Sequence, residues 1–233
     1  METNDKMSEL DLELKKLHDK LNSHIEEQNK NWKSFVYAQE NGFYQGFDEI
    51  KISGCRPTEK RFRRYNIEKF LSKRFSALDI GCNCGFFTIF VSRYLYSIEG
   101  VEINPYLVEI ANDTKKFLRT ENVNFYSSRF EDFKPNHNYD IIFSLANDET
   151  IDGNTKFTFE EYIQKIYNSL NENGLLMFET VSPDTYEPKL FQPKLKLLKK
   201  KFTVLEDKMV KSEYPKNVPE RRFLILRKSV LIN

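Results

Sequence analysis

A tight glycine-containing turn follows an apolar segment near the middle of the chain. Residues 77–87 read Ala-Leu-Asp-Ile-Gly-Cys-Asn-Cys-Gly-Phe-Phe, so Asp79 ends a predicted strand and Gly81 and Gly85 precede a helical pattern. Glycine adopts backbone angles that a Cβ forbids and lets a ligand approach the main chain. Glu102 ends the next apolar segment, at the roughly 20-residue distance at which α/β nucleotide folds hold a ribose by its hydroxyls. The pattern predicts a nucleotide-cofactor site.

The chemistry of this turn favours one kind of nucleotide over another. A pyrophosphate site prefers Gly-x-Gly-x-x-Gly, with helix amides facing the anion, and this turn lacks that spacing. Asp79, at the carboxyl end of its strand, is suited to accept hydrogen bonds from an ammonium group or from the amides of the turn. A dinucleotide is therefore the less favoured ligand.

These residues resemble the first motif of the class I S-adenosylmethionine-dependent methyltransferases, Asp/Glu-x-Gly-x-Gly-x-Gly with an acidic residue closing the second strand. The resemblance covers about residues 56–233. Within that family, residues 78–87 are similar to a branch with methyltransferases of bacterial surface polysaccharides and, more distantly, enzymes that modify the tRNA wobble uridine. Asn83 stands where the family has its middle glycine, and asparagine tolerates left-handed geometry better than other non-glycine residues. The resemblance implies S-adenosyl-L-methionine as cofactor, contacted by Asp79, Gly81, Asn83, Gly85 and Glu102.

Further cofactor contacts follow from the same resemblance. The segment after the third predicted strand frames the adenine in the family, which assigns Phe130, Glu131 and Asp132 to it, with Glu131 or Asp132 as acceptor from the exocyclic amine. The alternative is an acidic pair that merely begins a loop or helix. Ser144, ending the fourth predicted strand, and Arg56, as a partner of the cofactor carboxylate, complete the expected contacts.

The loop after the fourth predicted strand carries the candidate catalytic residues. It contains neither the histidine pair nor the Asn-Pro-Pro-Tyr run of related enzymes, and the absence of the latter argues against methylation of an exocyclic base or amide nitrogen. Asp148 is the first candidate for a general base that deprotonates a sugar hydroxyl, and Glu149 is the second. The alternative is that both are capping or solvated turn residues. Asn147 faces the acceptor in this interpretation.

Four other residues are candidates for substrate binding. Glu179 ends the fifth predicted strand, and its family counterparts lie near the acceptor. Tyr186 belongs to a proline-containing segment expected to form the rim. Arg61 and Arg64 could bind an anionic substrate with their guanidinium forks, or lie on a solvated helix face.

The order of the predicted elements indicates an α/β fold. We expect a Rossmann-like class I methyltransferase fold: a seven-stranded, mostly parallel sheet with helices on both faces, a C-terminal antiparallel hairpin and an N-terminal helical extension. Ligands of such sheets bind outside the carboxyl ends of the strands. The predicted strands are 76–80, 97–101, 123–126, 139–144, 175–179, 202–211 and 222–231, and the predicted helices are 86–95, 105–120 and 159–170.

Three regions are expected along the chain. Residues 1–33 form a helix with a short heptad-like stripe, which either packs on its own domain or serves as a dimerisation or docking helix. Residues 34–66 are an aromatic and basic connecting segment that closes over the ligand, with Thr58 as the cap of a helix that begins near Glu59. Residues 67–233 form the cofactor-binding domain. The stripe consists of Leu10, Leu14, Leu17, Leu21, His24 and Gln28.

Composition narrows the function classes. With 36 basic and 35 acidic residues the formal net charge is +1, so no global field attracts nucleic acid or an acidic membrane. No apolar run is long enough to span a membrane, and Cys55, Cys82 and Cys84 suggest free thiols, so a cytoplasmic location is expected. No metal-ligand spacing is present.

The favoured function is O-methylation of a saccharide or glycoconjugate hydroxyl, with a small-molecule or saccharide acceptor as partner. One alternative is an RNA-modifying methyltransferase that uses the basic residues of 56–64 and 194–201. Another is a catalytically inactive cofactor-binding scaffold, whose N-terminal helix recruits a partner.

Overall fold

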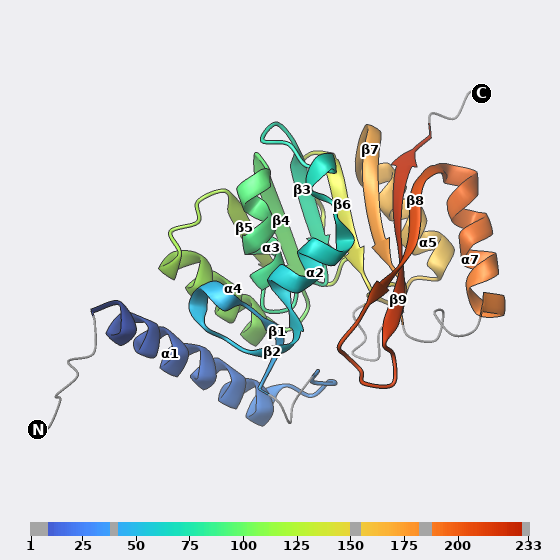
Figure 1. Cartoon of the computed structure of the whole chain (residues 1–233). Coiled ribbons are helices and arrows are strands. Elements are labelled where there is room, and N and C mark those ends of the chain that lie inside the picture. The colour runs from blue at the N-terminus through green and yellow to red at the C-terminus, as the bar shows by residue number, and fades with distance from the viewer. Residues whose placement is uncertain (1–8, 38–41, 150–154, 182–187, 230–233) are drawn as a thin grey trace, which may run out of the picture.

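A seven-stranded mixed sheet forms the centre of the protein, in a computed structural model that describes residues 9–37, 42–149, 155–181 and 188–229 (Figure 1). The strand order is β5-β4-β3-β6-β7-β9-β8. The first five strands of this order are parallel, and β9 is antiparallel to both of its neighbours. The bounds are β3 (Ser76–Ile80), β4 (Ser97–Glu102), β5 (Val123–Ser127), β6 (Tyr139–Leu145), β7 (Leu170–Glu179), β8 (Phe202–Lys211) and β9 (Glu220–Lys228).

Helices cover both faces of this sheet, which confirms the predicted fold class. On one face lie α2 (Thr58–Tyr65), α3 (Phe86–Val91) and α4 (Pro105–Phe117), and on the other lie α5 (Phe159–Ser169) and α7 (Pro188–Lys201) (Figure 1). A large hydrophobic core lies between the sheet and the helices on each face. Tyr162 and Leu198 pack in one core, and Phe62 and Phe87 pack in the other. No helix in the described ranges is long and apolar enough to cross a bilayer.

The N-terminal helix α1 (Glu9–Asn31) packs on its own chain. Leu14, Leu17 and Leu21 are buried in a third core that also contains Phe86 of α3 and Ile110 of α4. The stripe is therefore covered by this protein's own helices, as the first of the two interpretations predicts, while Leu10 at its beginning is 59% exposed.

A small second sheet links α1 to the main sheet. Its two parallel strands are β1 (Phe43–Gly46) and β2 (Gly54–Pro57), and the 3₁₀ helix η2 (Asp48–Ile50) lies between them. Two further 3₁₀ helices, η3 (Glu68–Phe70) and η4 (Ser92–Tyr94), flank β3 and its helix. The sequence pattern did not predict the small sheet.

The ends of several elements differ from expectation. Thr58 is not the cap of α2: Pro57 occupies the N-cap position, and the Thr58 hydroxyl is buried without a hydrogen-bond partner. The α-helix predicted to reach residue 95 ends at Val91 and continues as η4. Strand β7 begins at Leu170, five residues before the predicted strand 175–179.

Candidate cofactor and acceptor site

A pocket lies where β3, β4 and β6 end, on the side of the molecule that also carries β1, β2 and the last turns of α1 (Figure 1). Residues of the glycine turn, Glu102, and residues 145–147 after β6 line it together. This is the carboxyl edge of the parallel strands, where ligands of such sheets bind. The loops after β3, β4 and β6 thus meet at this pocket, whereas no described residue after β5 or β7 lines it.

Glu102 holds the loops on either side of it. Its carboxylate accepts hydrogen bonds from the backbone amide of Asn83 at 3.0 Å and from that of Asn104 at 2.9 Å. The side chain of Asn104 in turn accepts from the amide of Tyr106 and caps α4, which begins with Pro105. These bonds fix a carboxylate in the pocket wall at the end of β4, as a ribose-binding residue requires.

The glycine turn adopts the left-handed geometry that its residue types allow. Gly81, Asn83 and Gly85 have φ values of 65°, 54° and 68°. A Cβ on Gly85 would lie 2.6 Å from Ala111 of α4 and from Phe125 of β5, so this glycine also permits close packing of the turn. Asn83 therefore takes the backbone conformation of the glycine that it replaces.

One polar atom in this wall has no protein partner. The side-chain oxygen of Asn83 is buried and makes no hydrogen bond, although the residue lines the pocket. Buried polar atoms are nearly always satisfied, so this oxygen indicates a polar ligand. The amino and hydroxyl groups of a nucleoside cofactor supply such donors.

Asp79 lies beneath the turn at the end of β3. Its carboxylate is 3% exposed and accepts from the hydroxyl of Thr88 at 2.6 Å. Burial raises the pKa of Asp79 to about 6, against the lowering effects of Thr88 and Arg61. A cationic group bound beside Asp79 would lower this pKa again.

The N-terminal region forms one wall of the pocket. The sequence predicted only that residues 34–66 close over the ligand, without naming the residues that do so. Gln28 of α1 accepts a hydrogen bond from the side chain of Asn104 at 2.7 Å, which ties the helix to the loop after β4. Gln45 of β1 accepts from the amide of Phe86 and donates to the carbonyl of Cys82, so it fixes the glycine turn. The aromatic residues of the wall are Trp32, Phe35, Tyr37 and Tyr44.

The residues expected to frame the adenine lie apart from the pocket lining. Phe130 is buried in a core against Tyr162. Glu131 accepts from the amides of Lys156 and Phe157, and Asp132 is exposed. Glu131 therefore anchors the segment before α5 in this structure.

Ser144 and Asn147 form a buried polar network at the end of β6. The carboxamide oxygen of Asn147 accepts from the hydroxyls of Ser144 at 2.9 Å and of Tyr162 at 2.8 Å, and its nitrogen donates to the carbonyl of Ile80. Asn147 lines the pocket, and Ser144 orients it from behind. Ala146 has φ 63° and donates its amide to the carbonyl of Glu179.

The two candidate bases share one lysine. Lys194 of α7 lies 2.8 Å from the carboxylate of Asp148 and 2.9 Å from that of Glu149. The side chain of Asp148 is 0% exposed, whereas that of Glu149 is 60% exposed. Their environments therefore differ sharply although they are adjacent and have the same cation.

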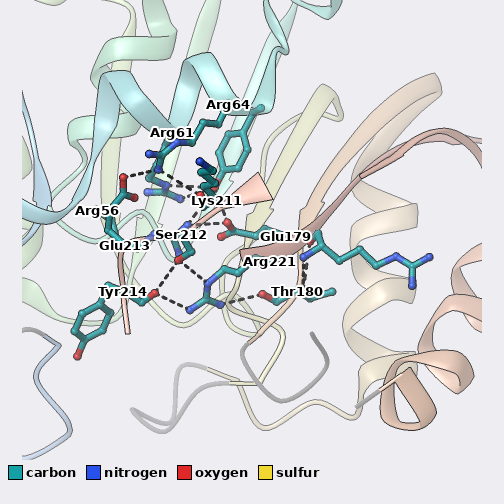
Figure 2. A network of polar contacts seen from close by, with 12 residues as sticks. Arg56, Arg61, Arg64, Glu179, Thr180, Lys211, Ser212, Glu213, Tyr214 and Arg221 are labelled. Carbon is teal, nitrogen blue, oxygen red and sulfur yellow. Dashed lines mark hydrogen bonds and ion pairs between the residues drawn. The ribbon is translucent and has the colours of Figure 1, made fainter. Parts of the chain in front are cut away.

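A buried arginine cluster surrounds Glu179 at the end of β7. Arg56 donates to Glu179 at 2.7 Å (Figure 2). Tyr65 donates to the same carboxylate oxygen at 3.0 Å, and Arg61 donates to the Tyr65 hydroxyl. Burial alone would raise the pKa of Glu179, but Arg56, Arg61 and Arg221 lower it to about 2. Arg64 lies outside this cluster, in a half-buried pair with Glu213. Tyr186 lies outside the described residues.

A family model described as a methyltransferase domain matches residues 71–220. The chain belongs to this methyltransferase family. S-adenosylmethionine is its cofactor, in agreement with the sequence-based expectation. The pocket fits such a cofactor, because it combines an anchored carboxylate at Glu102, a close-packed glycine turn and the unpartnered oxygen of Asn83.

Two curated relatives share part of the sequence. Malonyl-[acyl-carrier protein] O-methyltransferase 1 of Ilyobacter polytropus is 30% identical over 116 residues, which cover 49% of this methyltransferase and 41% of the relative. Malonyl-[acyl-carrier protein] O-methyltransferase of Calditerrivibrio nitroreducens is 32% identical over 116 residues, with 49% and 42% covered. The matched segment thus spans less than half of each relative.

Solved structures share the fold of this methyltransferase. N-methyltransferase NodS from Bradyrhizobium japonicum in complex with S-adenosyl-L-homocysteine has a TM-score of 0.59 at 12% identity, with 92% of this chain and 99% of that chain covered. A methyltransferase from Pyrococcus furiosus has a TM-score of 0.58 at 16% identity, with 91% and 98% covered.

Proposed function

We propose that this methyltransferase methylates an oxygen atom of an acceptor that binds where β6 and β7 end. The observation that carries the proposal is the carboxylate of Asp148, buried one residue beyond the pocket residue Asn147 and paired with Lys194. A carboxylate at this point of the sheet can take the proton of an acceptor hydroxyl. Its neighbour Glu149 is largely solvated and is the weaker candidate.

When bound, the cofactor would supply a methyl group that is already activated on a sulfonium, and the electron pair of the broken carbon–sulfur bond would remain on its sulfur. The residues of the protein then contribute alignment and proton removal. Glu102 and the glycine turn hold the nucleoside end at β3 and β4. Asp148 accepts the hydroxyl proton as the acceptor oxygen forms its new bond. Lys194 holds the carboxylate of Asp148 in an ion pair at 2.8 Å.

A saccharide or glycoconjugate hydroxyl is the acceptor that we favour. The resemblance of residues 78–87 to a branch with surface-polysaccharide methyltransferases supports this choice. The pocket also presents several aromatic side chains, whose flat apolar faces and polar tips suit a ligand with both apolar and hydroxyl surfaces.

A carboxylate oxygen is the second candidate acceptor. The two curated relatives are named for O-methylation of malonyl-acyl carrier protein, which supports oxygen as the methylated atom. A carboxylate is already anionic and needs no general base, so Asp148 would be dispensable for it. RNA gains no comparable support, because the net charge is +1. A solved tRNA methyltransferase and a solved rRNA methylase, 21% and 13% identical, share only the fold with this chain.

The test measures transfer of a labelled methyl group from S-adenosylmethionine to methyl glycosides, a malonyl thioester and tRNA. Asp148→Asn should lower kcat on a hydroxyl acceptor by roughly 10²-fold or more, while the affinity for S-adenosylhomocysteine is retained. Glu149→Gln is the matched control, because it removes the other carboxylate paired with Lys194 and should leave kcat nearly unchanged. Full activity of Asp148→Asn on a hydroxyl would refute the base, and methylation at nitrogen would refute the proposal.

A further inference from the structure

We infer that the acceptor carries a carboxylate, which Arg56 binds together with Arg221 at the end of β7. This inference rests on the proposed function, because it names the chemical class of the acceptor at the same site. It gives Arg56 a role at the acceptor instead of at the cofactor.

The first argument is the unused hydrogen-bonding capacity of Arg56. Its side chain is 1% exposed, and one terminal nitrogen donates to Glu179 and Tyr65. Its Nε and its other terminal nitrogen are buried and have no partner. A buried guanidinium with two unsatisfied nitrogens is costly by itself. Nε and Nη1 lie on different edges of the guanidinium, so a carboxylate oxygen of a ligand would satisfy one of them and another oxygen of the same ligand would satisfy the other.

The second argument is the charge of the cluster. Arg56, Arg61 and Arg221 all interact with the single carboxylate of Glu179. They come from β2, α2 and β9, so three elements bring cations to one acidic residue (Figure 2). Buried cations need anionic partners, and an anionic ligand would add one.

The third argument is the position of Arg221 and Tyr44. Arg221 is 5% exposed, and its guanidinium donates to the carbonyls of Thr180 at 3.0 Å and Tyr214 at 3.3 Å. Tyr44 lines the cofactor pocket, and its ring packs edge-to-face against that of Tyr214 at a centroid distance of 5.6 Å. Tyr44 thus connects the arginine cluster to the pocket.

The sheet order assigns this carboxylate to the acceptor. The ribose-binding candidate Glu102 ends β4, the glycine turn follows β3, and Glu179 ends β7, which lies beyond β6. Neighbouring strands are about 4.8 Å apart, so the cluster lies roughly 10 Å along the sheet from the turn, away from the ribose. An acceptor beyond the transferred methyl group occupies that side.

The experiment uses two pairs of probes that differ in one carboxylate. Methyl glucuronide is compared with methyl glucoside, and malonyl N-acetylcysteamine with acetyl N-acetylcysteamine, each titrated calorimetrically into the full chain saturated with S-adenosylhomocysteine. The wild type should bind the charged member of at least one pair about tenfold or more tightly. The pair that discriminates identifies the source as a uronic acid or as an acyl chain.

Three variants separate recognition from folding. Arg56→Lys keeps the charge but loses the fork, and the double variant R56Q/E179Q removes both members of the buried pair so that neither charge is left alone. Both should lose the preference for the charged probe and retain the wild-type affinity for S-adenosylhomocysteine. Arg64→Gln, outside the cluster, should change neither affinity.

Two results would overturn the inference. One is equal wild-type affinity for charged and neutral probes. The other is weaker S-adenosylhomocysteine binding by Arg56→Lys, with the probe preference unchanged, which would return Arg56 to the cofactor carboxylate. Failure of the wild type to bind S-adenosylhomocysteine or to transfer methyl groups to oxygen would instead contradict the proposed function.

Discussion

Arg56 and Glu179 lie 123 positions apart in the sequence and form a 2.7 Å ion pair in which neither side chain is more than 1% exposed. The pair joins the small N-terminal sheet to the end of β7, next to the pocket. Removal of one partner leaves an uncompensated buried charge, a change that typically costs about 3–5 kcal/mol.

Glu179→Gln should therefore lower the free energy of unfolding by about 3–5 kcal/mol at pH 7. The folded pKa of about 2 lies below the ordinary value of 4.5, so the ionised carboxylate stabilises the fold above pH 4.5 and loses this effect as the pH falls towards 2. Urea unfolding at pH 7, 5 and 3 should show the difference between wild type and variant shrinking at the lowest pH. The exposed Glu160→Gln serves as control, and a constant difference would contradict the prediction.

Glu102→Ala should weaken S-adenosylhomocysteine binding by about tenfold or more, since hydrogen bonds to a charged group contribute roughly 1.5–3 kcal/mol. Calorimetric titration measures the effect. Glu109→Ala, an exposed acidic residue on α4, should bind like the wild type. Unchanged binding by Glu102→Ala would exclude this carboxylate from the cofactor site.

The affinity for S-adenosylhomocysteine should fall below pH 6. The folded pKa of Asp79 is raised to about 6 by burial, so the carboxylate is protonated at lower pH and no longer attracts the cationic amino group of the ligand. Affinity at pH 5 should be about tenfold lower than at pH 8. Asp79→Asn should bind more weakly and show no step near pH 6, and a step that persists in this variant would implicate another group.

Leu21→Ala should lower the free energy of unfolding by about 2–5 kcal/mol, because Leu21 is 0% exposed in the core between α1 and α4. Leu10→Ala on the same helix should change stability little, since Leu10 is 59% exposed. Chemical denaturation compares the two. Equal effects would mean that α1 does not pack as described.

The strands and the cofactor turn were predictable because they depend on local patterns. Asp79, Gly81, Gly85 and Glu102 follow from strand ends and turn chemistry, and a parallel sheet then brings them to one edge. The polar residue at the end of the α1 stripe also indicated a specific contact. Gln28 is buried, and its side-chain oxygen accepts a hydrogen bond from Asn104.

Other features depend on contacts between distant residues. The helix α3 ends early where Asn122 donates to the carbonyls of Ser92 and Leu95, a contact that no local pattern encodes. Strand β1 is four residues long and acts through Gln45, whose partners lie more than 35 residues away. The pairing of Arg56 with Glu179 is of the same kind.

Because α1 contributes part of the pocket wall, binding of the cofactor and docking of α1 affect each other. Residues of α1 and of the segment after it line the pocket, so a chain with α1 undocked has an incomplete site. A ligand that binds only the docked form, at a concentration 100 times its Kd, favours docking by about 2.7 kcal/mol. Local undocking of the first helix and release of the cofactor are therefore thermodynamically coupled, so a higher cofactor concentration raises the fraction of molecules in which α1 is packed against α3 and α4.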